Sequence, residues 1–219
     1  MVVVCGMKKP TWIVIFISLQ VVIFSLILII LNHDHWFYQK WAYNGNIVES
    51  FKGKLLHPGT SANKCTQNET YKQCYDNCEF HCIRFYNWYY AGAIYIATDS
   101  IVLGLCFINS VFLLMDFFNF QDLRGIVNVY TTSFIMVLIL IFHFLALSIW
   151  ANVVKVNYGD CTHGLDQINI ESVCAGEGFS LSVALLVGLG VVNPCYYLVA
   201  NKLNGRLPNL MDESGIDLI

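Results

Sequence analysis

Residues 12–31 read WIVIFISLQVVIFSLILIIL, a predominantly apolar run without a charged side chain. A helix of about 20 residues is long enough to cross a hydrocarbon core roughly 30 Å thick. Three similar runs extend from about residue 91 to 115, 129 to 153 and 179 to 200. Backbone polar groups inside hydrocarbon must be paired within their own segment, and these runs do not alternate as barrel strands do. We therefore predict four transmembrane helices.

The composition of the whole chain agrees with this prediction. Apolar residues make up 57% of the 219 residues, charged residues make up 12%, and the mean hydropathy is +0.57. A soluble domain carries about twice as many charged residues, so this chain lacks the charge to cover a water-facing surface. The formal net charge is -3 and the sequence has no lysine- or arginine-rich cluster, which argues against a nucleic-acid partner.

Basic residues flank the first and the last predicted helix. Lys8 and Lys9 precede the first, and Lys202 and Arg206 follow the last. Positive charge near a helix end favours the cytosol, so we expect both termini there. The first helix is interpreted as a retained anchor, because its apolar stretch is about twice as long as that of a signal peptide and no small-x-small cleavage site follows. The chain is then one tetraspan domain, 1–219, with outer loops 32–90 and 154–178 and tails 1–11 and 201–219.

The two predicted outer loops hold most of the cysteines. An even set of cysteines on one side of the membrane suits an oxidising compartment, whereas free thiols would indicate a reducing one. Asn68-Glu69-Thr70 is an N-glycosylation acceptor in the first loop. These features place both loops outside and predict the plasma membrane. The loop cysteines are Cys65, Cys74, Cys78, Cys82, Cys161 and Cys174.

The sequence leaves the pairing of these cysteines open. Cys161 with Cys174 would close a short segment of the second loop. Cys78 and Cys82 can pair if their Cα atoms come within about 7 Å, as one helical turn allows, or one of them crosses to the second loop. A metal site that includes His81 is the alternative. The spacing lacks the Cys-x2-Cys of zinc sites, so we predict no metal.

A β-hairpin is predicted directly after the first helix. Residues 35–43 read HWFYQKWAY, and aromatic side chains favour half-buried strands. An Asn-Gly dipeptide follows, which is a strong two-residue turn, and residues 47–51 would return as the second strand. Trp36 and Trp41 are the candidate functional aromatics of this loop, although a belt of aromatics at the membrane surface also explains them.

The layout of the chain resembles that of the claudin superfamily, which includes peripheral myelin protein relatives and the stargazin-type auxiliary subunits. His35-Trp36-Phe37-Tyr38 resembles the Trp-Leu-Tyr that follows the first helix of the stargazin type. Cys65 and Cys74 resemble the paired first-loop cysteines of claudins, and Gln73-Cys74-Tyr75-Asp76 is similar to the stretch around the second of them. The Gly-Leu-Trp that precedes this pair in claudins is missing, and the other four loop cysteines are additional.

This resemblance implies a fold and one disulfide. The fold is an all-α membrane protein, a left-handed four-helix bundle topped by a small antiparallel sheet built from both outer loops. The disulfide joins Cys65 to Cys74. The resemblance also implies adhesion or barrier function, or a role as an auxiliary subunit of a channel or receptor.

Polar residues inside the predicted helices are further candidates. A carboxylate in a bilayer is costly and marks a functional site by default, and Asp99 lies within the second predicted helix. An Asp99–His143 pair would suggest a proton or ion path. We expect His143 to lie nearer the membrane middle, so that Asp99 bonds neighbours near the interface and has a structural or partner-binding role.

Small residues recur every four positions toward the last helix, at Gly176, Ser180, Ala184 and Gly188. Such a stripe lets another helix approach closely. We expect packing within the bundle, with a contact to a partner subunit as the alternative. Pro194 is expected to kink or weaken the inner end of this helix.

The sequence contains no Cys-x-x-Cys, His-Glu-x-x-His or Gly-x-Ser-x-Gly motif and no glycine-rich phosphate loop. We predict a non-enzymatic protein without a cofactor that acts through protein contacts of its outer loops. A pore-forming oligomer is the alternative, followed by an intramembrane transporter or enzyme. Expected partners are membrane lipid and a membrane protein, either a second copy or a larger channel or receptor. The terminal Ile219 could also occupy a PDZ-type pocket.

Overall fold

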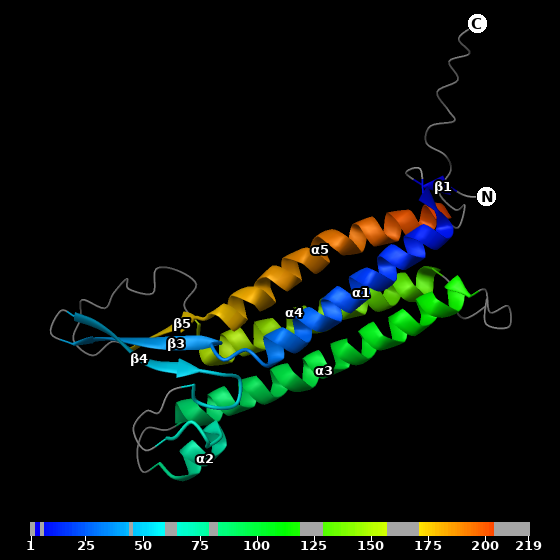
Figure 1. Cartoon of the computed structure of the whole chain (residues 1–219). Helices are drawn as coiled ribbons and strands as arrows, with labels where there is room; N and C mark the ends of the chain where they lie inside the picture. Colours follow the sequence, from blue (N-terminus) through cyan, green and yellow to red (C-terminus); the bar gives the residue numbers. More distant parts are fainter. Residues whose placement is uncertain are drawn as a thin grey trace, which may run out of the picture.

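The computed structural model describes residues 3–4, 7–43, 46–59, 65–78, 83–118, 129–156 and 171–203. Within this part, four long helices form a bundle with a small sheet at one end (Figure 1). Each of the four is long and apolar enough to cross a membrane, which indicates a multi-pass membrane protein and confirms the four predicted apolar helices. The helices are α1 (Lys9–Leu31), α3 (Ile83–Phe117), α4 (Val129–Val154) and α5 (Glu177–Leu203).

The largest difference from the predicted helix bounds lies at the start of α3. This helix begins at Ile83 rather than near residue 91, so the first outer loop is shorter than expected. The added turns carry Trp88, whose ring packs against Phe37 of the sheet with centroids 4.8 Å apart; this tertiary contact extends the helix beyond its apolar run. Helix α5 continues through Pro194 to Leu203, as expected of a predicted helix that ran past Pro194 to about residue 200.

The helices surround one another in a ring. Helix α3 packs against α1 and α4, and α5 packs against the same two helices. The interior is apolar, with Ile27, Met136 and Leu189 almost wholly buried. The outer faces are apolar as well: Val21, Phe107, Phe134 and Val191 are between 57% and 65% exposed. Helices that are apolar on every side suit a lipid environment, because lipid tails solvate the outer faces.

The sheet joins the two outer loops. Strand β3 (Phe37–Tyr43) pairs antiparallel with β4 (Asn46–Gly53) on one side and with β5 (Glu171–Ala175) on the other, in the order β4-β3-β5. This confirms the predicted hairpin and the sheet made from both loops. In Figure 1 the sheet extends beyond the bundle, away from the end where α1 begins and α5 finishes.

The opposite end of the bundle is closed by short contacts. Strands β1 (Val3–Val4) and β2 (Met7–Lys8) pair there, and the Lys9 ammonium lies 2.8 Å from the Asp116 carboxylate, which joins α1 to α3. Pro10 occupies the first turn of α1, where its missing N–H leaves no helical hydrogen bond unmade.

Candidate functional site

Trp36 anchors the sheet in the bundle. It directly precedes β3 and is fully buried, and its indole N–H donates to the carbonyl oxygen of Ile30, 3.0 Å away. Its ring meets those of Tyr95 and Trp150 edge-on, with centroids 4.6 and 5.0 Å apart, an arrangement that aromatic quadrupoles favour. Trp36 therefore contacts protein rather than lipid, and an aromatic belt does not explain it. Trp41 lies further along β3, opposite Val48 and Glu171.

Backbone hydrogen bonds also join His35 and Trp36 to β4 and to the start of α5. Trp36 donates its N–H to Gly53 of β4 at 2.7 Å and accepts from Gly176 at 2.9 Å, and Gly178 donates to His35 at 2.8 Å. A Cβ on Gly176 would lie 2.6 Å from the His35 carbonyl oxygen and 2.7 Å from the Trp36 carbonyl carbon. Gly176 is therefore part of this anchor and precedes α5, rather than belonging to a helix-packing stripe.

A second group of aromatic rings lies beside the anchor. Phe37 contacts Trp88, Phe51 and Tyr71, with ring centroids 4.8 to 6.3 Å apart. Tyr71 begins the short helix α2 (Tyr71–Asp76), and its hydroxyl donates to the Lys54 carbonyl at 3.2 Å. Burial raises the pKa of the Tyr71 phenol well above its usual value, so it stays a neutral donor. These contacts fix the sheet to α2 and α3.

Both loops contain disulfide-bonded cysteines. Cys65 and Cys74 of the first loop form a disulfide with Cα atoms 5.2 Å apart, as the claudin resemblance implied. Cys78 of the first loop and Cys174 of the second each take part in a disulfide as well. Cys82, Cys161 and His81 lie outside the described residues, so the remaining pairings and the metal alternative stay predictions.

The proposed glycosylation site lies between the two cysteines of that disulfide. Asn68 is exposed in the turn between Cys65 and α2. The backbone N–H and the hydroxyl of Thr66 both donate to the Glu69 carboxylate and hold its pKa below the usual value. The Thr70 side chain then caps α2, which gives this turn a defined shape.

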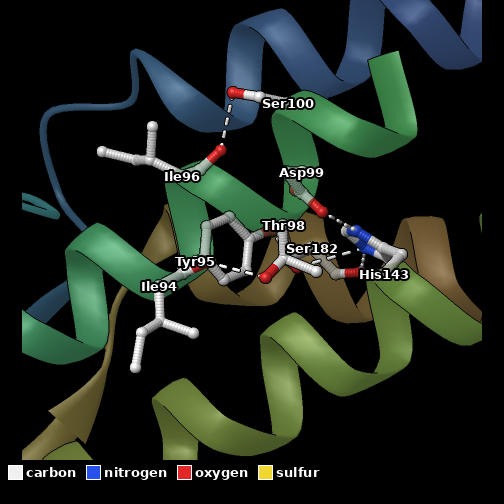
Figure 2. A network of polar contacts seen from close by, with 8 residues as sticks. All are labelled: Ile94, Tyr95, Ile96, Thr98, Asp99, Ser100, His143 and Ser182. Carbon is white, nitrogen blue, oxygen red and sulfur yellow. Dashed lines mark hydrogen bonds and ion pairs between the residues drawn. The ribbon is translucent and has the colours of Figure 1, made fainter. Parts of the chain in front are cut away.

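A buried polar network lies directly below the anchor (Figure 2). The Tyr95 hydroxyl, whose ring touches Trp36, lies 2.9 Å from the Ser182 hydroxyl. His143 Nε2 is 3.1 Å from the Ser182 carbonyl oxygen, and His143 Nδ1 is 3.0 Å from Asp99 Oδ1. All four residues are fully buried. The network thus joins α3, α4 and α5, and through the Tyr95 ring it contacts Trp36, which directly precedes β3.

The expectation that Asp99 and His143 would lie at different depths is wrong. The two side chains meet inside the bundle, where Figure 2 shows them facing each other across α3 and α4.

Both ring nitrogens of His143 have hydrogen-bond partners. Nδ1 faces Asp99 Oδ1, and Nε2 faces the carbonyl oxygen of Ser182 at 3.1 Å and its hydroxyl at 3.3 Å. These contacts matter because a buried charged group that loses its partner costs several kcal/mol.

Neighbouring polar residues do not join this network. Thr98 and Ser100 each donate to a carbonyl oxygen one turn earlier in α3. Gln20 of α1 donates to the Met136 sulfur at 2.7 Å. Asp99 Oδ2 has no hydrogen-bond partner in the described part of the chain.

The small-residue stripe of α5 faces outward. Ser180, Ala184 and Gly188 are exposed, and a Cβ on Gly188 would meet no atom within 4 Å in the described structure. The expected packing of these residues within the bundle is therefore wrong. The buried face of α5 is formed instead by Ser182, Leu185 and Leu189, which leaves the stripe on the other side of the helix.

Comparisons with known proteins do not assign this arrangement. No protein-family model matches the chain, and a comparison with curated proteins finds no match. The claudin resemblance therefore stays a prediction.

Proposed function

We propose that this chain is a non-enzymatic protein of the plasma membrane whose outer sheet binds the outer part of another membrane protein. Both termini would be cytosolic and the sheet extracellular. The observation that carries the proposal is the anchor at Trp36, which is fully buried and hydrogen-bonded on its side chain and backbone. A sheet held in this way keeps one orientation, so it can bind a partner without an ordering cost.

The short connections to the bundle favour a partner in the same membrane. Residues 32–36 join α1 to β3, and Gly176 alone separates β5 from α5. Without a stalk, the sheet stays close to the membrane surface and lies beside the outer part of a neighbouring channel or receptor. We therefore propose an auxiliary subunit first. Cell–cell adhesion is the second candidate, supported by the direction of the hairpin away from the bundle in Figure 1.

We expect a larger membrane protein to co-purify stoichiometrically with the tagged full-length chain from its native cells in mild detergent. A Trp41→Ser variant should reduce its recovery about tenfold or more, because interface aromatics carry much of the binding energy. Tyr86→Ser is the matched control, an exposed aromatic of α3 outside the sheet. Quantitative mass spectrometry of the purified material measures both.

Two outcomes would contradict the auxiliary-subunit proposal. Equal partner recovery from wild type and Trp41→Ser would remove the sheet as the contact surface. Recovery of this chain alone, as a ladder of homo-oligomers, would favour adhesion strands or a pore, and conductance in liposomes would separate those two.

A further inference from the structure

A cavity of about 780 Å³ lies where the sheet meets the outer end of α5. Its walls come from the segment before β3, from β3 and β4, and from the first turns of α5. Polar and charged side chains gather on these walls, while Phe37, Ala175 and Leu181 add apolar surface. The polar and charged residues that line the cavity are His33, His35, Tyr38, Lys52, Glu177 and Ser180.

The position of the cavity matches a lipid headgroup. The apolar segment of α5 begins at Glu177, so the cavity lies at the level where this helix would enter the hydrocarbon. Leu181 is on the cavity wall and is 38% exposed. Ala184 and Gly188 continue the same outward face one and two turns further. A molecule in the cavity therefore has a smooth apolar surface directly below it.

The cavity wall offers hydrogen-bond donors for a phosphate. His33 Nδ1 accepts the backbone N–H of His35 at 3.2 Å, so in the neutral ring the hydrogen is on Nε2. That nitrogen lies 3.6 Å from the Glu177 carboxylate. Lys52 and Tyr38 also line the cavity. Ammonium and N–H groups together are the donors that phosphate oxygens prefer.

The same cavity offers an acceptor for a cation. The Glu177 carboxylate is largely exposed at the cavity. Lys52 and Glu177 carry opposite charges and both line the cavity. A ligand that complements it carries one anionic and one cationic group, as the headgroup of a zwitterionic phospholipid does.

We propose that this cavity binds the headgroup of a zwitterionic phospholipid. The phosphate would face Lys52 and His33, and the ammonium would face Glu177. The acyl chains would follow Leu181, Ala184 and Gly188 along the outward face of α5. Three separate features support this occupant: the charge pattern of the lining, the level of the cavity on α5, and the exposed small residues below it.

The test is native mass spectrometry of the delipidated full-length protein in detergent, titrated with phosphatidylethanolamine or with phosphatidylglycerol of the same acyl chains. We expect phosphatidylethanolamine to bind at least about fivefold more tightly. Glu177→Gln should weaken its binding about tenfold, the size of one charge-assisted hydrogen bond, and leave phosphatidylglycerol unaffected. Lys52→Gln should weaken both lipids, because both carry the phosphate.

The matched control is Lys54→Gln, since Lys54 pairs with Asp34 and is not part of the cavity lining. It should bind both lipids as the wild type does. Equal affinity of the wild type for the two lipids would overturn the proposal, as would unchanged binding in Glu177→Gln. An apparent Tm close to that of the wild type will show that each variant is folded, and Glu177→Asp, which keeps the charge, should retain the preference.

Discussion

Replacing Trp36 with alanine is expected to release the outer sheet from the bundle. The ring is fully buried between Tyr95 and Trp150, and its N–H is bonded to the Ile30 carbonyl. Truncating a buried tryptophan to alanine costs roughly 3–5 kcal/mol, because it leaves a cavity that the surroundings fill only in part. Here the loss falls on the junction, so the sheet should open before the helices separate.

Hydrogen exchange measures this effect by region. In Trp36→Ala, amides of β3, β4 and β5 should exchange much faster than in the wild type, whereas amides in the centre of α1 and α4 should change little. Trp36→Phe should lie between the two, because it keeps one aromatic ring but loses the indole N–H and the volume of the second ring. Val21→Ala, on the lipid-facing side of α1, is the control. Equal exchange of the sheet in Trp36→Ala and wild type would show that Trp36 is not the anchor.

Removing one partner of the Asp99–His143 pair is expected to destabilise the bundle strongly. His143→Leu leaves a buried carboxyl group without its hydrogen-bonding partner, and Asp99→Leu leaves a buried imidazole in the same position. Breaking a buried pair in this way costs roughly 3–5 kcal/mol, which is the loss that we expect for each single variant.

The double variant separates pairing from burial. Asp99→Leu/His143→Leu should be less destabilised than the sum of the two single variants, because neither unpaired group remains. Thermal unfolding of the four proteins in the same detergent gives the comparison. Additive losses would show that the two side chains do not depend on each other. Asp99→Asn keeps a hydrogen-bonding group, so this variant should fold, reach the cell surface and still bind the partner protein. If the chain were a transporter or an enzyme, the same variant would lose its activity.

These two predictions concern one connected structure. Tyr95 touches Trp36 with its ring and Ser182 with its hydroxyl, so the sheet anchor and the polar network share a residue. Loss of the Asp99–His143 pair should therefore also loosen the sheet, although less than loss of Trp36. This prediction tests the structural role of Asp99, which the sequence favours over a role in transport.

Local features of the sequence predicted much of the fold. The four spans follow from the length and composition of their apolar runs, and the hairpin follows from aromatic residues on either side of an Asn-Gly turn. The Cys65–Cys74 disulfide came from the claudin resemblance rather than from spacing. Each of these features depends on residues that are close together in the chain.

The features that sequence reasoning missed depend on the depth and rotation of whole helices. The meeting of Asp99 and His143 depends on how α3 and α4 are offset and rotated against each other. The outward direction of Ala184 and Gly188 requires knowing which face of α5 is buried, and an apolar helix with little amphipathicity does not reveal this. Tyr95 lies one turn before Asp99 on the same face, and that spacing was the available clue to its place in the network.

The most direct test of the central claim, that the outer sheet is the contact surface for another membrane protein, is site-specific photo-crosslinking in native membranes. A photoreactive phenylalanine analogue at position 41 of β3 should capture one larger membrane protein, whereas the same analogue at Val21 on the lipid-facing side of α1 should not. Capture of that protein from position 41 alone is the result that our account predicts. Capture of nothing, or only of second copies of this chain, from position 41 would contradict it.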